Sequence, residues 1–441
     1  MRNYIPFLTI SVFILILLSA LVIQSVGCAE PPLDKTKAVS QVEPLAKITV
    51  EAGKHTRIDT AVSVELEGIS SADALHLVEI LPSGTEPVAA QIEPGNPPRL
   101  WWILSGTTPA DSNRYYELVI SCDDKAMKGT EVKTIKNDSF LELRINDANI
   151  LRYNNAVVPA PPGKDKLYDR SGFIHPLRSP TGAVMTDIHP ADHIHHFGIW
   201  MPWTKTEFQG QEVDFWNLDK GLGTVRFVKF LSTTSGPVYG GFEAEQEHVA
   251  LKTAEGEKVV LKEVWDVRAY NIGWPKKEYY LIDFKSTQRC VADSPLRQIE
   301  YRYGGFGFRG ASQWKDENAA YLTSEGKTRV DGHGTRARWC DMAGAIEGKW
   351  AGVTIMSHPK NFRHPEPMRI WPPEERFVFF NFAPSQIGDW EMKPGEDYVF
   401  RYRLYVHEGK INVADTERIW NDYAEPPTAR LEKITPKAQK Q

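Results

Sequence analysis

The chain has 441 residues, of which 41% are hydrophobic and 25% charged, a balance typical of a globular protein with two domains or one large domain and an accessory module. Its formal net charge of -5 and the lack of a long basic run exclude electrostatic capture of nucleic acid. The sequence contains 13 tryptophans, and in an exported protein such a number often indicates surfaces for ring stacking.

Residues 1–29 have the features of an export signal or of an N-terminal membrane anchor. A single basic residue precedes an apolar run from Ile5 to Ile23, which is long enough to span a bilayer. The letters "SVGC" end at Cys28 and resemble a lipoprotein cleavage box, although Ser25 stands where an aliphatic residue is usual. We expect an exported protein that is periplasmic, outer-surface or extracellular, with any membrane tether confined to the N-terminus.

Short runs of β-branched and aromatic residues follow a predicted linker over residues 30–45. They are "RIDTAVSVEL", "ALHLVEIL", "RLWWILS" and "RYYELVIS", and turn signals such as "PSG", "EPGNPP" and "TTPADSN" separate them. This pattern predicts a small antiparallel β sandwich over residues 46–136.

Longer strands are predicted in the second part of the chain, with a boundary near Asn137. "TVRFVKFLSTT", "GGFEAEQEHVAL", "KVVLKEVWDVRAY" and "EYYLIDFKSTQ" each run for about ten residues or more, and "FVFFNFAP" and "YVFRYRLYVHEG" close the unit. We therefore expect an all-β chain in which residues 137–410 form a large antiparallel β supersandwich. The last segment, residues 411–441, is predicted to hold a tail and one helix, "VADTERIWNDYAEP", capped by Asp415 and stopped by two prolines.

The segment "DIHPADHIHHFGIWMPW", from Asp187 to Trp203, holds four of the chain's 12 histidines. In a strand, His193 and His195 would point to one face and His196 to the other. Three interpretations are open: a metal site, an acid/base site, or histidines that cap loops and bond to the backbone. So many titratable groups in one short segment are costly unless they are used, which favours a functional interpretation.

A divalent metal is possible at this segment, although no cofactor is favoured. Two imidazoles at positions i and i+2 of a strand suit zinc or iron, so His193 and His195 would be the ligands. The candidates for a third ligand are His175, His189, Asp192, His358 and His364. No HExxH is present, and Ile199 and Trp200 occupy the place where a cupin-like pattern has a Glu.

Acid/base chemistry on a saccharide is the favoured interpretation, because imidazole is the side chain best matched to proton transfer near neutral pH. An enzyme of this kind also needs flat apolar faces for pyranose rings and an arginine for carboxylates or hydroxyls. The predicted catalytic residues are His193, His195, His196, His175 and His358. The predicted substrate-binding residues are Arg309, Trp200, Trp203, Tyr303, Arg363 and His364, with Trp216 as a further stacking face.

Two distant segments are expected to contribute to this site. In "YRYGGFGFRG" the glycines either let the backbone pass close to a ligand or form bulges in a twisted strand. "SHPKNFRHPEP" contains three prolines, which indicates a rigid, irregular loop of the kind that often carries function. We expect His175, Arg309 and His358 to come close to the segment from His193 to His196.

At these residues the chain resembles the bacterial family commonly labelled "methane oxygenase PmoA", or PmoA-like. The similarity runs in order from roughly Asn137 to Gly409, through "SGFIHPLRSPTGAVMTDIHPADHIHHFGIW", "VDFW", "YGGFGFRGAS", "WCDMAG", "GVTIMSHPKNFRHP" and "YRLYVHEG". A membrane methane monooxygenase subunit would need several spanning helices, whereas this chain has one apolar segment at its start. The resemblance implies the galactose-mutarotase-like supersandwich, which mutarotases, polysaccharide lyases and some glycoside hydrolases share. Mutarotases pair a His acid with a Glu base, and no partner Glu is obvious here.

We therefore expect an exported carbohydrate-active protein whose His-rich cleft acts on a glycan or uronate-bearing sugar by elimination, hydrolysis or epimerisation. A non-catalytic glycan-binding protein of the cell surface is the alternative from a different class. A metal-dependent enzyme that uses the histidine cluster is a third hypothesis. Nucleic acid is not an expected partner.

Overall fold

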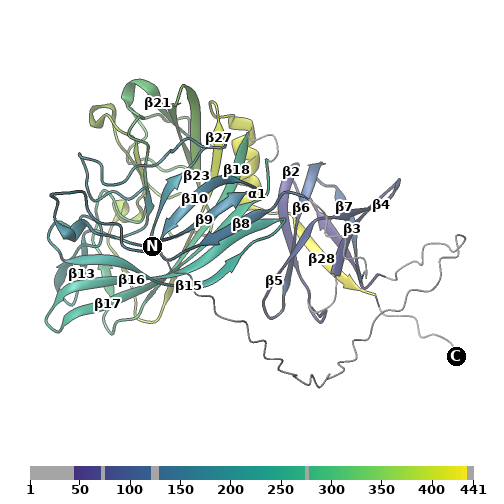
Figure 1. Cartoon of the computed structure of the whole chain (residues 1–441), viewed down its shortest axis with the longest axis horizontal. Helices are drawn as coiled ribbons and strands as arrows, with labels where there is room; N and C mark the ends of the chain where they lie inside the picture. Colours follow the sequence, from purple (N-terminus) through teal and green to yellow (C-terminus); the bar gives the residue numbers. More distant parts are fainter. Residues whose placement is uncertain (1–43, 71–74, 121–128, 274–277, 435–441) are drawn as a thin grey trace, which may run out of the picture. The chain divides into compact units, whose positions relative to one another are not determined.

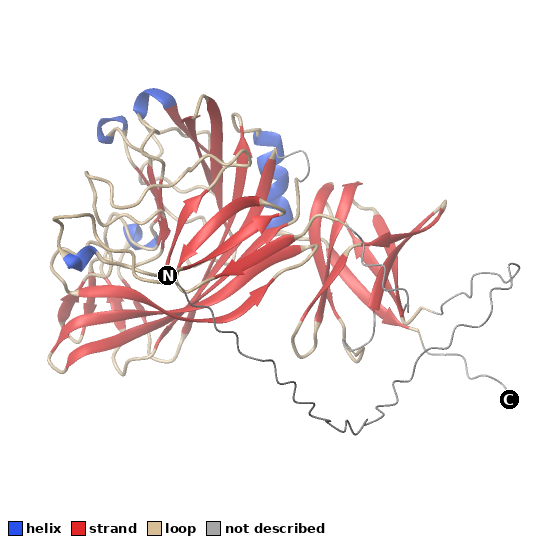
Figure 2. Ribbon diagram, viewed as in Figure 1, coloured by secondary structure: helices blue, strands red, loops and turns tan. Residues whose placement is uncertain are grey.

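The computed structural model of the protein describes residues 44–70, 75–120, 129–273 and 278–434. The predicted signal or anchor, with Cys28, lies outside these residues, as does nearly all of the predicted linker. Strands dominate the described residues, and helical segments are few and short (Figure 2). No helix within the described ranges is both long and apolar enough to cross a membrane.

The prediction of an all-β, antiparallel chain is confirmed. Two sheets near the N-terminus share one hydrophobic core, in which Ile48 and Tyr116 of one sheet meet Val62 and Trp102 of the other. The first sheet has the order β28 (Thr428–Lys433), β1 (Ala46–Glu51), β7 (Asn113–Ile120), β3 (Leu75–Leu81) and β4 (Gly84–Val88). The second has the order β2 (Arg57–Glu65), β6 (Arg99–Thr108) and β5 (Ala90–Glu93).

Three further sheets form the larger part of the chain. The first has the order β24 (Met368–Ile370), β25 (Phe379–Phe382), β20 (Phe306–Arg309), β12 (Ile199–Trp200), β11 (Phe173–Leu177), β10 (Ala148–Asn154), β9 (Phe140–Ile145) and β8 (Val132–Lys136). The second has the order β15 (Gly223–Thr234), β16 (Tyr239–Thr253), β17 (Gly256–Tyr270), β18 (Tyr279–Cys290), β27 (Asp397–Glu408), β23 (Lys349–Ser357), β22 (Trp339–Ile346) and β21 (Ala319–Thr323). A four-stranded sheet has the order β14 (Gln211–Val213), β13 (Thr206–Phe208), β19 (Leu296–Gln298) and β26 (Trp390–Met392).

The long strands of the eight-stranded sheet that begins with β15 run side by side as antiparallel neighbours, as the teal ribbons of β15–β17 show (Figure 1). Their sequences alternate as a strand with one buried face requires. In β16, Gln246 and His248 are fully buried, whereas Glu243, Glu245 and Glu247 point to the other face. This carboxylate row is partly solvated, and Glu245 lies within ion-pair distance of two lysines.

The predicted C-terminal helix is present as α1 (Val413–Ala424), but its cap differs from the prediction. Asn412, not Asp415, is the N-cap, because its side-chain oxygen accepts hydrogen bonds from the first free backbone amides of the helix. After the helix, β28 pairs with β1, so the C-terminal segment also supplies a strand that the sequence did not indicate. Four short 3-10 helices complete the described residues, at Lys166–Tyr168, Asp316–Asn318, Pro373–Glu375 and Pro384–Ile387.

The predicted boundary near Asn137 lies inside a hairpin. β8 ends at Lys136 and pairs with β9, which begins at Phe140. Asn137 closes the turn between them, because its side-chain oxygen accepts hydrogen bonds from the amides of Ser139 and Phe140. The turn residues that suggested a domain boundary therefore connect two strands of one sheet.

Candidate functional site

The histidine segment is a loop of tight turns and not a strand. The amide of His193 donates to the carbonyl of Pro190 at 3.1 Å, and that of His196 donates to the carbonyl of His193 at 3.0 Å. The amide of His189 closes the loop on the carbonyl of His196 at 3.0 Å. The expected strand alternation is therefore wrong here, and β12 begins only at Ile199.

The turns bring three imidazoles together. The ring centres of His193, His195 and His196 lie between 4.9 and 5.6 Å from one another. His196 is 2% exposed and stacks between His193 and Phe379 at interplanar angles of 24°. His189 fits the structural interpretation, because its Nε2 lies 3.1 Å from the carbonyl of Tyr168.

Asp192 joins one of these imidazoles to a buried arginine. Its carboxylate receives two hydrogen bonds from Arg309, at 2.8 and 2.9 Å, and its Oδ2 lies 3.0 Å from Nδ1 of His193. Burial alone would raise the pKa of Asp192, but the hydrogen bonds from His193 and Arg309 outweigh it and hold this pKa well below its usual range. An ionised carboxylate only accepts hydrogen bonds, so Nδ1 of His193 carries the proton and Nε2 remains available to a ligand.

His195 and His196 are held in the neutral form. Burial, together with the neighbouring His193 and Arg309, lowers the pKa of His195 to about 4. Burial likewise lowers the pKa of His196 well below its ordinary value. His195 forms no hydrogen bond with any residue that the structure describes, and Nδ1 of His196 is buried without a partner in the same set.

A cavity of about 130 Å³ opens beside these histidines. All three imidazoles line it. Its aromatic lining comes from Trp216, Tyr303, Trp371 and Phe379, and its charged lining from Arg302, Arg369 and Glu375. The aromatic residues belong to a hydrophobic cluster that also contains Trp200, so the cavity has a rigid apolar wall.

Several predicted ligand-binding residues are instead structural. Trp200 and Trp203 are fully buried, so neither can stack on a sugar ring. Trp200 packs on Trp216 with ring centres 4.7 Å apart, and Nε1 of Trp203 donates to Gln288 at 2.6 Å. Arg309 is 1% exposed, and Asp192 occupies both of its Nη atoms, so it positions Asp192 and does not bind a substrate carboxylate.

The structure does not bring His175 or His358 into the cavity lining. Nδ1 of His175 lies 2.9 Å from the hydroxyl of Thr186, and burial lowers the pKa of His175 to about 4. His358 accepts the amide of Lys360 at 3.0 Å and lies edge-on to Tyr423 of α1, with ring centres 5.0 Å apart. The expectation that His358 joins the histidine cluster is therefore not met.

The side chains of the loop "SHPKNFRHPEP" bond to one another and to the segment around Pro384. Arg363 donates to the carbonyls of Pro384 and Gly388 at 2.7 and 2.8 Å. His364 lies 3.0 Å from the hydroxyl of Ser357, which itself donates to the buried Glu366 at 2.6 Å. Neither Arg363 nor His364 lines the cavity, and both side chains are held by these bonds.

The glycines of "YRYGGFGFRG" make room for indole rings and not for a ligand. A Cβ at Gly307 would lie 2.8 Å from Trp216 and 3.4 Å from Trp200. Gly304 and Gly305 have φ values of 134° and 98°, a conformation that other residues rarely adopt. Gly307 therefore makes room for a ring of the aromatic wall, whereas Gly304 and Gly305 lie against the buried Trp203.

Sequence reasoning missed much of the cavity lining. Arg302 lies in "YRYGGFGFRG", the segment from which only Arg309 and Tyr303 were predicted to bind a ligand. Arg369, Trp371 and Glu375 lie in "MRIWPPEE". The second segment combines Arg, Trp and Glu with two prolines. That composition indicates a rigid loop, and loops often carry binding residues, so it could have pointed to this part of the lining. Tyr303, which the sequence did predict, lines the cavity, and its hydroxyl donates to Asn217 at 2.9 Å.

No three His, Cys, Asp or Glu side chains are placed to hold a metal ion within the described ranges. Asp192, the nearest carboxylate to His193, already binds Arg309. The proposed ligand pair His193 and His195 thus has no third donor in this part of the chain.

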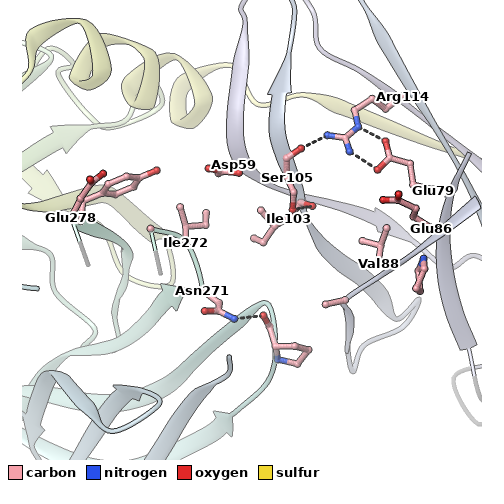
Figure 3. Close-up of a pocket in the computed structure, with 15 residues that line it drawn as sticks. Asp59, Glu79, Glu86, Val88, Ile103, Ser105, Arg114, Asn271, Ile272 and Glu278 are labelled. Carbon is pink, nitrogen blue, oxygen red and sulfur yellow. Dashed lines mark hydrogen bonds and ion pairs between the residues drawn. The ribbon is translucent and has the colours of Figure 1, made fainter. Parts of the chain in front are cut away.

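A second, larger cavity of about 530 Å³ has a different lining (Figure 3). Its charged side chains are mainly acidic, with Asp59, Glu86 and Glu278 among them. Arg114 also lines it, but its guanidinium is paired with Glu79 and donates to the carbonyl of Ser105, as the dashed lines show (Figure 3). Since no imidazole lines this cavity, we place the candidate site at the smaller one.

Comparisons with known proteins identify the family of the chain. A model described as "Family of unknown function (DUF6807)" matches residues 141–421, more than half of the chain. The chain belongs to this family. All of the cavity residues lie within the matched range. The family's description names no activity and carries no PmoA label. Membership of the PmoA-like family therefore stays a prediction. No curated protein matches the chain.

The solved structures that match the chain include two chains from Enterococcus faecalis. A protein in the glycosyl hydrolase family 38 matches with 11% identity and a TM-score of 0.40, covering 88% of this chain and 47% of its own. An alpha-mannosidase from strain V583 matches with 11% identity and a TM-score of 0.41, covering 88% of this chain and 46% of its own. This DUF6807 chain therefore spans about half the length of the solved structures it matches.

Proposed function

We propose that the cavity beside His193, His195 and His196 binds a saccharide and performs general acid/base chemistry on it. The observation that carries this proposal is the pair formed by Asp192 and His193, whose imidazole lines an aromatic-walled cavity. A carboxylate on one imidazole nitrogen fixes the tautomer and stabilises the imidazolium that forms when the other nitrogen takes a proton.

Each cavity residue has a distinct role in this proposal. Nε2 of His193 is the general base, and Arg309 holds Asp192 in place through two hydrogen bonds. His195 stays neutral at physiological pH because its pKa is about 4, so it can donate to or accept from a sugar oxygen. Tyr303, an aromatic side chain of the lining that is partly exposed, supplies a flat face for the ring.

The resemblance of residues 137–409 to the PmoA-like family, and through it to sugar-active supersandwich proteins, supports a saccharide as the ligand. Elimination, hydrolysis and epimerisation each require a base of this kind. The mass of the product separates them, because hydrolysis adds one water across the cleaved bond, whereas elimination and epimerisation do not.

The test is turnover of a glycan panel by the purified protein, followed by product mass spectrometry. His193→Gln keeps a polar side chain of similar reach but removes the base, so we expect the rate to fall by about two to four orders of magnitude. His55→Gln is the matched control, because His55 lies at the surface of the small sandwich and its Nε2 is 3.3 Å from Glu425. Equal turnover in wild type and His193→Gln would refute the proposed base.

The glycan-binding alternative gives a different result. A binding protein needs the aromatic wall but not the base, so it should yield no product with any glycan and should keep its affinity in His193→Gln and His195→Ala. That outcome would replace the enzymatic proposal with the non-catalytic one.

A further inference from the structure

We propose that the ligand of this cavity carries an anionic group, a carboxylate or a sulfate ester, and that Arg302 and Arg369 bind it. The inference rests on the proposed function for the saccharide part of the ligand. The anionic part rests on a separate observation, which is an unbalanced pair of guanidinium groups at the cavity.

Arg369 is a largely buried cation with few partners. Its side chain is 12% exposed, and its Nε is buried with no hydrogen-bond partner among the described residues. Its Nη2 lies 4.0 Å from Glu375, which is too far for a hydrogen bond and sits at the limit of an ion pair. Burial and the nearby Arg302 lower the pKa of Arg369, so its surroundings disfavour the charge that it carries.

The remaining hydrogen bond of Arg369 is to a neutral group. Its Nη1 lies 3.1 Å from Nε2 of His333. A guanidinium has only donors, so this imidazole nitrogen must accept and His333 must be neutral. His333 therefore supplies no negative charge to offset Arg369.

Arg302 adds a second cation at the rim of the same cavity. Its guanidinium lies 5.8 Å from the ring centre of Tyr303, and it forms no ion pair with any carboxylate of the described residues. Among the described residues, Glu375 is the carboxylate that lines the cavity, so Arg302 and Arg369 face one anion there. Asp192 does not correct this balance, because Arg309 already neutralises it.

The chemistry of this surplus charge favours an oxyanion that accepts several hydrogen bonds. Guanidinium groups present a planar fork of donors that matches carboxylate and sulfate oxygens. A buried cation without a close counter-ion is costly, and an anionic ligand would remove that cost when it binds. A sugar ring against the partly exposed Tyr303 would place its acidic substituent within the same small cavity.

Calorimetric titration of the full chain with glucuronate, glucose 6-sulfate and glucose tests the inference. We expect at least one acidic sugar to bind about tenfold more tightly than glucose, which is the effect of one charge-assisted hydrogen bond. Arg369→Gln should abolish that preference, and Arg302→Gln should weaken it. The affinity for the acidic sugar should also fall as salt is raised.

The control variant is Arg289→Gln, because Arg289 is an exposed arginine of β18 that pairs with Asp397 away from the cavity. It should keep the wild-type preference. Comparing glucuronate with glucose 6-sulfate decides which anion the site takes. If Arg369→Gln does not fold, the exposed Arg302→Gln variant still tests the same charge.

The inference is overturned if glucose binds as tightly as both acidic sugars, if neither acidic sugar binds at millimolar concentration, or if the folded arginine variants keep the preference. Its failure differs from that of the proposed function. Arginine-dependent binding of an acidic sugar without turnover of any glycan sinks the acid/base proposal and leaves this inference standing. If the protein turns over neutral glycans and Arg369→Gln does not change that rate, the acid/base proposal stands and this inference fails.

Discussion

Acid should destabilise this protein through His175, a partly buried imidazole outside the cavity. Its Nδ1 lies 2.9 Å from the hydroxyl of Thr186, which also accepts the amide of Leu177 at 3.0 Å. Either atom can donate in the bond between Nδ1 and this hydroxyl, depending on the tautomer of the neutral imidazole. Burial, with the nearby charges of Arg152 and Arg178, lowers the pKa of His175 from its ordinary 6.5 to about 4.

The direction of the effect follows from which state binds the proton first. The unfolded chain is protonated at this residue as the pH falls through 6.5, whereas the folded chain is protonated only near pH 4. The stability contributed by neutral His175 is therefore complete above pH 6.5 and is lost as the pH falls toward 4. One pKa unit corresponds to about 1.4 kcal/mol, so the loss at pH 4 is about 3 kcal/mol from this residue.

Urea unfolding between pH 4 and pH 8, followed by tryptophan fluorescence, measures this contribution in wild type and His175→Gln. The substitution costs packing energy at every pH, but it removes the titration. We therefore expect the stability of the variant to change with pH by about 3 kcal/mol less than that of the wild type. Identical pH dependence in the two proteins would refute the assignment of His175 as a partly buried neutral group.

His407→Gln is the control with the opposite sign. Burial tends to lower the pKa of His407, but its hydrogen bond to Asp341, at 2.9 Å, outweighs burial and raises this pKa. The stability that His407 contributes is then complete below pH 6.5 and lost as the pH rises through its folded value. The variant should therefore differ from wild type most at acidic pH, and the difference should shrink as the pH rises.

Three further predictions concern other parts of the chain. Arg309→Gln removes both guanidinium hydrogen bonds of Asp192 and leaves only the contact with His193. Because that carboxylate is 29% exposed, we expect a loss of about 2–3 kcal/mol in urea unfolding, with a loss below about 1 kcal/mol refuting the pair. Gly307→Ala places a methyl 2.8 Å from Trp216, so we expect about 1–3 kcal/mol of destabilisation and altered tryptophan fluorescence, whereas unchanged spectra and stability would count against the packing described. Export should place the mature N-terminus at or just after Cys28, with radiolabelled lipid incorporated only if that residue is modified; an unprocessed N-terminus on cytoplasmic protein would contradict it.

The sequence by itself determined the class of fold and the position of most long strands. In β16, alternating burial follows the alternation of polar and apolar letters, because successive side chains of a strand point to opposite faces. It also determined which segment holds the histidine cluster. Three histidines within four positions are brought together by any tight loop, so their proximity depends on local backbone geometry alone.

Only the tertiary structure decided the role of each residue around them. Asp192 meets Arg309 across 117 positions of sequence, and Arg369 and Trp371 arrive from β24 and the loop after it. These neighbours depend on the order β12-β20-β25-β24 in one sheet. Residue alternation specifies which face of a strand is buried but not which strand lies beside it, because strand order is set by long-range pairing.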